Sequence, residues 1–134
     1  MNGVADYFDA LDTHHFPGAG SGKQARVYDL IRAQEQAVLA PLLDWLRARN
    51  NVRVLGPVDA SVRAPTVALD CGRPGEELSE ALVAHKVACW GGDFYSARLV
   101  EKMGAGHGAL RLSFVHYTSP AEVEQAMKAL DAVL

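Results

Sequence analysis

The chain has 134 residues, of which 49% are apolar and 22% are charged, with a formal net charge of −3. This length suits one folded domain with a substantial core, and the slight negative charge without a run of Lys or Arg argues against nucleic acid or an anionic membrane as a partner. No apolar stretch approaches the roughly 18 residues that span a bilayer, and the N-terminus lacks the regions of a signal peptide, so we expect a cytoplasmic protein.

Two helices are predicted before the first strand. Apolar residues form one stripe from Val4 to Leu11, and a loop rich in His, Gly and Pro follows. The longest helical pattern then runs from about Gly22 to Ala48 with an approximate 3.6-residue period. Pro41 lies inside this pattern and removes one backbone donor, so we expect a kink or a break near residues 37–40, with a bent long helix as the better expectation.

Short β-branched and apolar runs bounded by Gly and Pro predict strands in the rest of the chain. The predicted strands are Val52–Leu55, Thr66–Asp70, Val87–Trp90 and Ala109–Val115. Helical spacing predicts two further helices, over Glu76–His85 and about Phe94–Met103.

The closing helix has the clearest start in the sequence. Ser119 stands at the N-cap, Pro120 at the first helical position and Glu122 at the position that completes a capping box. The whole order predicts a single α+β domain, a two-layer sandwich with a small, mostly antiparallel sheet covered by helices. Residues 1–50 would supply the N-terminal helix and a long connector helix, and residues 51–134 the α+β small domain.

Arg111 is the strongest candidate for a binding residue. Alternation along its strand places Leu110 and Leu112 on one face and Arg111 on the other, so the guanidinium points away from the core. Its planar fork of donors matches a carboxylate in two parallel hydrogen bonds. The alternative is that Arg111 lies on the wet face of a half-solvated sheet.

Other motifs carry weaker signals. The glycine-rich run before Lys23 lacks the first glycine and the hydroxyl residue of a phosphate-binding loop, and we interpret it as a flexible linker. The histidines show no metal-ligand spacing, so no metal site is predicted. Cys71 and Cys89 fall in or beside predicted strands, and we expect reduced, buried thiols. Asp93 could cap the helix that follows the Gly91–Tyr95 loop.

Four segments together resemble the C-terminal small domain of class V aminotransferases. They are the strand Val87–Trp90, the loop Gly91–Arg98, the run Leu110–Tyr117 and the helix start Ser119–Glu122. More narrowly, the chain is similar to the cysteine desulfurase-like and selenocysteine lyase-like branch of these fold-type I pyridoxal-phosphate enzymes. The resemblance implies that Arg111 binds the α-carboxylate of an amino-acid substrate. It also implies an active-site wall that includes Gly91, Gly92, Asp93, Phe94, Tyr95, His116 and Tyr117.

The sequence departs from the family pattern at two places. The family commonly continues His-Tyr-Asn-Thr, whereas this chain has His116, Tyr117, Thr118 and Ser119. Its cysteine desulfurases also carry a catalytic cysteine in the loop that corresponds to Gly91–Ser96, which has none. Persulfide chemistry is therefore not implied. Transaminase, lyase or epimerase chemistry is as compatible with the resemblance as desulfuration is.

Pyridoxal phosphate needs a lysine, an acidic partner for the ring nitrogen and a phosphate cradle, which the family places upstream of this region. We therefore expect a C-terminal portion of a longer enzyme, with no catalytic or cofactor-binding residues of its own and no activity alone. Exposed apolar faces that include Val27, Ile31 and Trp45 favour a homodimer. The alternative is a stand-alone, non-catalytic α+β module that binds a small carboxylate or a protein partner.

Overall fold

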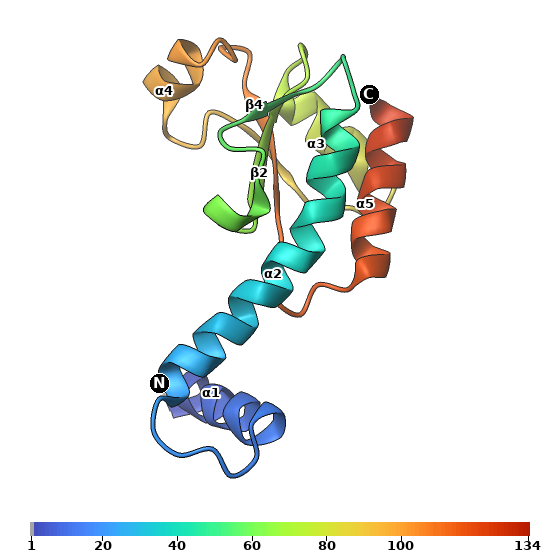
Figure 1. Ribbon diagram of the computed structural model, residues 1–134. Coiled ribbons are helices and arrows are strands. Elements are labelled where there is room, and N and C mark those ends of the chain that lie inside the picture. The colour runs from blue at the N-terminus through green and yellow to red at the C-terminus, as the bar shows by residue number, and fades with distance from the viewer. Residues whose placement is uncertain (1) are drawn as a thin grey trace.

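The computed structural model describes residues 2–134, and their side chains from Gly3 onward. Helices and strands alternate along most of the chain, and Figure 1 shows the long helix α2 leading from α1 into the α+β body. The elements are α1 (Asn2–His15), α2 (Lys23–Arg47), β1 (Arg53–Leu55), the 3-10 turn η1 (Ala60–Val62), β2 (Thr66–Asp70), α3 (Gly75–Val83), β3 (Trp90–Gly92), α4 (Ala97–Lys102), β4 (Ala109–Ser113) and α5 (Pro120–Val133).

The four strands form one open sheet in the order β1-β2-β4-β3, and every neighbouring pair is antiparallel. The predicted α+β class with a small antiparallel sheet is therefore confirmed. Arg111 on β4 lies between Ala68 on β2 and Trp90 on β3, directly opposite each of them. This register decides which side chains surround the guanidinium.

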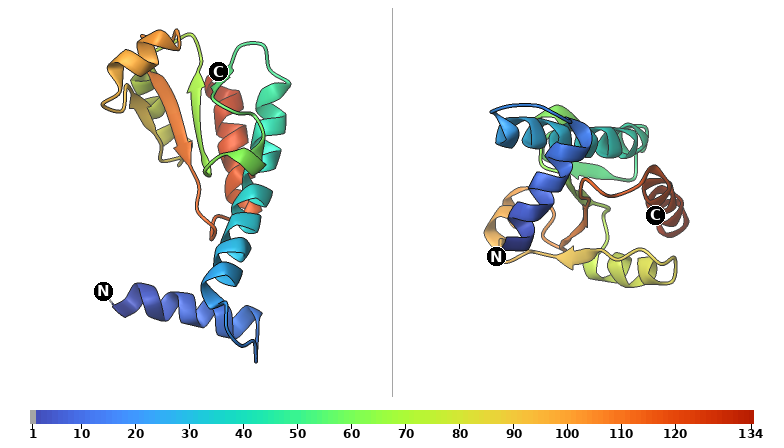
Figure 2. Two further views of the ribbon diagram at one scale, coloured as in Figure 1. Left: turned by 60° about the vertical axis from the view of Figure 1, so that its left-hand side comes forward. Right: turned by 90° about the horizontal axis from the view of Figure 1, so that it is seen from below.

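One face of the sheet carries the main core. Val67, Leu69, Leu110 and Leu112 point into a cluster with the buried leucines of α2, α3 and α5, which lie on that side of the sheet in Figure 2. Burying each such side chain contributes about 1.5–3 kcal/mol. The alternation predicted for the Arg111 strand is thus confirmed for its inward-facing leucines.

The opposite face is only partly covered. A smaller cluster joins Leu55 and Ala109 of the sheet to Val100 and Ala105 of the segment around α4, and Phe94 packs at its edge. Leu55 and Ala109 lie on the same face of the sheet as Arg111. The segment around α4 therefore covers part of that face.

Helix α2 continues through Pro41, so the chain is not broken there. Pro41 is exposed, and a helix tolerates the lost donor best on its solvent side, where its hydrogen bonds already lengthen. Along the same helix Val27 is fully buried, while Ile31 and Trp45 are half-buried. The expected self-association face does not include Val27.

The third strand was predicted too early. Residues 87–89 are irregular, and β3 begins at Trp90. Lys86 adopts a positive φ of 60°, which ends the turn after α3, and the chain pairs with β4 only from Trp90, four residues later. Cys89 is therefore outside the strand.

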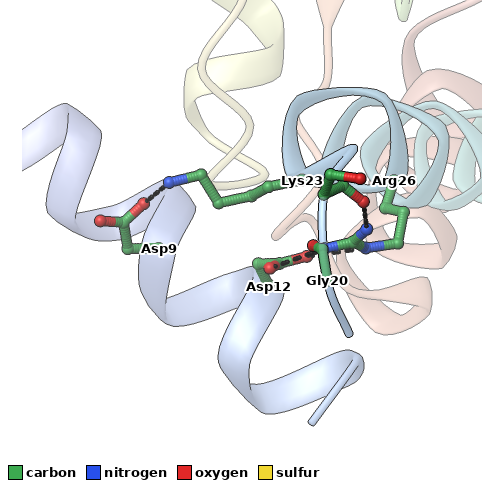
Figure 3. Close-up of polar contacts among 6 residues, drawn as sticks. Asp9, Asp12, Gly20, Lys23 and Arg26 are labelled. Atoms are coloured by element: carbon green, nitrogen blue, oxygen red, sulfur yellow. Dashed lines mark hydrogen bonds and ion pairs between the residues drawn. The ribbon is translucent and has the colours of Figure 1, made fainter. Parts of the chain in front are cut away.

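The loop before α2 is tied down instead of acting as a free linker. Arg26 donates to both carboxylate oxygens of Asp12 at 3.1 and 3.0 Å and to the carbonyl of Gly20 at 3.2 Å. Lys23 pairs with Asp9, as Figure 3 shows. These contacts fix α1 across the end of α2, where Figure 2 shows it away from the sheet.

Candidate functional site

Arg111 lies on the exposed face of β4 with aromatic side chains beside it. Its guanidinium carbon lies 4.3 Å from the centroid of the Phe94 ring, and Trp90, directly opposite across the β3–β4 pair, is 66% exposed. Among residues 2–134, the structure shows no hydrogen bond or ion pair to the Arg111 side chain. Its N–H donors are therefore available to an anion.

The loop between β3 and α4 brings Phe94 over this arginine. Phe94 and Tyr95 both have a positive φ, 54° and 59°, which is uncommon for aromatic residues and costs on the order of 1–3 kcal/mol each. Asp93 holds this conformation, because its Oδ1 accepts from the Tyr95 N–H at 2.9 Å and its carbonyl accepts from the Ser96 N–H at 2.9 Å. The expectation that Asp93 caps the helix is wrong, since the N-cap of α4 is Ser96.

Gly91 and Gly92 shape the wall by allowing close packing. A Cβ atom on Gly91 would lie 2.0 Å from the backbone carbonyl of Gly75, at the start of α3. Gly92 has a φ of 132°, and a Cβ there would lie 2.9 Å from Oε1 of Glu76. Both residues are buried, so they let α3 approach the sheet and do not present a side chain to a ligand.

His116 and Tyr117 belong to a second group, beyond the end of β4. Nε2 of His116 lies 2.6 Å from the Tyr7 hydroxyl of α1, and Tyr117 stacks edge-on against His116. These three residues line a cavity of about 280 Å³ together with Leu11 and Leu30. The predicted wall is therefore divided: Phe94 contacts Arg111, whereas His116 and Tyr117 face the N-terminal helices.

A charged cluster around Asp70 was not predicted from the sequence. The Asp70 carboxylate accepts from Arg53 at 2.6 Å, from the Gly72 N–H at 3.1 Å and is 2.9 Å from Nε2 of His107. Burial opposes ionisation of Asp70, but these donors outweigh it and lower its pKa. Arg53 and Asp70 are cross-strand partners in the β1–β2 register, which only the paired sheet reveals.

Neither cysteine is activated. Burial raises the pKa of Cys71 to about 11, with the Asp70 charge adding to the effect and Arg73 opposing it, and burial also raises the pKa of Cys89. Both thiols are free and half-buried, less buried than expected.

We predict slow alkylation of both thiols by iodoacetamide in the native protein at pH 7. With a pKa near 11, only about one Cys71 thiol in ten thousand is ionised at that pH. Mass spectrometry of the native and the urea-unfolded chain would measure the two rates, with the unfolded chain as the control. Fast stoichiometric labelling of the native chain would contradict the prediction.

The described lysines do not form a pyridoxal phosphate site. All four are exposed: Lys23, Lys86, Lys102 and Lys128. Lys128 borders a cavity with Glu124 and Asp131, but it is paired with Glu124 at 3.4 Å, and Asp131 is paired with Arg49. Lys86 borders a cavity with Glu122, but the Glu122 carboxylate already accepts from the Ser119 N–H at 2.7 Å and from the Ser119 hydroxyl at 2.8 Å. The acid is thus committed to the predicted capping box and is not free to pair with a ring nitrogen.

Within residues 2–134 the structure shows no group of three or more His, Cys, Asp or Glu side chains that could hold a metal ion. In the same part of the chain, no helix is both long and apolar enough to cross a membrane.

Comparison with solved structures identifies the fold of this chain. An antiparallel four-stranded sheet of this kind superposes on a cysteine desulfurase from Thermococcus onnurineus, with a TM-score of 0.72 and 22% identity over 83% of this chain and 28% of that one. The cysteine desulfurase CsdA from Escherichia coli gives 0.62 and 22% over 76% and 25%. The NifS-like protein from Rickettsia africae gives 0.67 and 14% over 83% and 31%. The fold is that of class V aminotransferases.

A curated relative supports the same class by sequence. The aminotransferase-like protein FGM3 of Gibberella zeae is 34% identical over 116 residues, which cover 81% of this chain and 29% of the relative. No protein-family model matches the sequence. The predicted resemblance to the class V aminotransferase small domain is thus confirmed, and the chain spans less than a third of the length of each of these proteins.

Proposed function

We propose that this chain is the substrate-carboxylate-binding portion of a pyridoxal-phosphate-dependent enzyme that acts on an amino acid. The observation that carries the proposal is the exposed Arg111 guanidinium, which has no polar partner among residues 2–134 and is backed by the Phe94 ring. A charged donor fork left free on a rigid strand is suited to a bidentate contact with a carboxylate. In this proposal the amino acid binds through its α-carboxylate.

The cofactor would be held by residues outside this chain. Pyridoxal phosphate, when bound, supplies the electron sink for bond cleavage at the α-carbon of the amino acid. Arg111 would bind and orient the substrate, while the neighbouring Trp90 and Phe94 limit the access of water to the contact. Alone, the chain would have no activity.

The raised pKa values of Cys71 and Cys89 favour transaminase, lyase or epimerase chemistry over desulfuration through a cysteine of this chain. Similarity to selenocysteine lyases, a cytoplasmic location and a homodimer formed through exposed apolar faces remain parts of the proposal.

The test uses the polypeptide that carries this chain together with the cofactor-binding region. Amino acids are screened for a change in the visible spectrum of bound pyridoxal phosphate, and the best responder is titrated. Arg111→Lys is expected to raise its half-saturating concentration about tenfold or more, because a point charge replaces the bidentate fork.

Arg47→Lys is the matched control, because Arg47 lies on α2, on the far side of the sheet, and pairs with Asp44 at 2.8 Å. Its titration should match that of the wild type. An unchanged half-saturating concentration for Arg111→Lys would overturn the carboxylate role. If no amino acid alters the spectrum, the stand-alone binding module becomes the better explanation.

A further inference from the structure

The affinity of an arginine for an anion depends on how well its side chain is ordered before the anion binds. Arg111 has several rotatable bonds, it is exposed, and within residues 2–134 no polar group holds its guanidinium. A side chain of this kind loses rotamer entropy when it binds, which weakens the contact. Whatever restricts Arg111 before binding therefore contributes to affinity.

The Phe94 ring is the only aromatic ring that the structure of residues 2–134 shows stacked with Arg111. At 4.3 Å from its centroid, the guanidinium carbon lies against the ring face. A cation–π contact of this kind does not use the N–H donors as hydrogen bonds, and the structure shows none of them bonded within residues 2–134. Phe94 itself is half-buried against the cluster of Leu55, Val100 and Ala109, so the ring is anchored while the charge it contacts is exposed.

The backbone of the loop places this ring. Phe94 and Tyr95 occupy the left-handed region, and the Tyr95 side chain is fully exposed, so packing of Tyr95 does not explain the conformation. The hydrogen bond from the Tyr95 N–H to Oδ1 of Asp93 closes the turn around Phe94. Asp93 maintains this unfavourable backbone through its carboxylate and its carbonyl, and such a maintained conformation is typical of a site that needs a fixed geometry.

We propose that Phe94 and Asp93 are positioning residues for Arg111: Phe94 holds the plane of the guanidinium, and Asp93 holds the turn that places Phe94. This inference rests on the proposed carboxylate-binding function, in which Arg111 is the contacting residue. Neither Phe94 nor Asp93 needs to touch the substrate.

The first measurement is made on the 134-residue chain without any ligand. Nitrogen-15 relaxation of the Arg111 Nε–H group reports how restricted the side chain is. Phe94→Leu removes the ring but keeps apolar volume, and it should lower the order parameter of this group to the flexible range, below about 0.6. Phe94→Tyr keeps the ring and should preserve the wild-type value.

The Asp93 variants test the turn without altering the packed ring. Asp93→Ala removes the Oδ1 acceptor and should mobilise Arg111, whereas Asp93→Asn keeps the acceptor, removes the charge and should behave as the wild type. These variants change an exposed loop residue, so they give an answer even if Phe94→Leu fails to fold. Unchanged Arg111 dynamics in Asp93→Ala and in every folded Phe94 variant would overturn the inference.

The second measurement is the amino-acid titration of the cofactor-loaded polypeptide. Phe94→Leu and Asp93→Ala should raise the half-saturating concentration about three- to tenfold and leave the maximal response unchanged, because only the orientation of the binding group is lost. If Arg111→Lys has no effect, the proposed function fails, while the relaxation data still decide whether Phe94 and Asp93 position Arg111. If Arg111→Lys weakens binding but the positioning variants do not, the inference alone fails.

Discussion

Replacing Gly91 with alanine is expected to destabilise the domain by about 3 kcal/mol or more, because the added methyl group overpacks a contact between two backbone segments. Its Cβ would lie 2.0 Å from the carbonyl carbon and oxygen of Gly75 and 2.3 Å from the Glu76 nitrogen. Backbone atoms at the start of α3 cannot rotate away as a flexible side chain can. Either α3 or β3 must shift, and Arg111 pairs with β3.

Thermal unfolding followed by circular dichroism would measure the loss, expected as a Tm lower by roughly 10 °C for a domain of this size. Gly75→Ala should behave similarly, since its Cβ would lie 2.2 Å from the Ala109 oxygen. Gly106→Ala is the control, because its Cβ would meet nothing within 4 Å. Equal Tm values for Gly91→Ala and Gly106→Ala would show that α3 does not pack against the sheet in this way.

Replacing Asp70 with asparagine is expected to cost about 2 kcal/mol at pH 7, because Arg53 and His107 lose their anionic partner at a largely buried position. The Asp70 side chain is 13% exposed, and the two partners lie 2.6 and 2.9 Å from its oxygens. The carboxylate joins β1 and β2 to the loop that contains His107, so its loss loosens the smaller cluster formed by Leu55, Val100, Ala105 and Ala109.

The effect should depend on pH with a definite sign. The folded-state pKa of Asp70 is lowered, so its ionised form contributes stability that is fully present above the unfolded-state pKa, near 4, and is lost as the pH falls through the folded-state pKa. Urea unfolding at pH 7 and at pH 3 should therefore show the gap between wild type and variant shrinking in acid. Asp44→Asn, at an exposed pair with Arg47, should change stability by less than about 0.5 kcal/mol at both pH values. If wild type and Asp70→Asn differed by the same unfolding free energy at pH 7 and at pH 3, the ionised Asp70 carboxylate would not be the source of the stability.

Several features were predictable because they depend on neighbours in the chain. Alternation around Arg111 correctly placed Leu110 and Leu112 in the core, and the residues from Ser119 to Glu122 form the predicted capping box. The sequence also carried the similarity to class V aminotransferases, which the solved structures and the curated relative confirm. Each of these depends on local spacing or on a motif that can be read along the sequence.

The limits of that prediction are clearest at β3 and in the Gly91–Tyr95 loop. The apolar run Val87–Trp90 indicated a strand, but hydrogen bonding to β4 begins only at Trp90. Asp93 precedes a helix and its residue type predicts a cap, yet its carboxylate closes the turn to Tyr95, and the N-cap is Ser96. Both errors arise where the partner strand and the backbone angles determine the outcome.

The sequence by itself determined most of the elements, the buried faces and the outward direction of Arg111, because periodicity and capping act over a few residues. Only the tertiary structure decided that Phe94 lies over Arg111, that His116 contacts Tyr7 of α1 and that Asp70 holds Arg53 and His107. These contacts join residues brought together by strand register and by positive backbone angles in one loop. Strand register and positive backbone angles produce no periodic pattern in the sequence, because they depend on how the formed helices and strands pack.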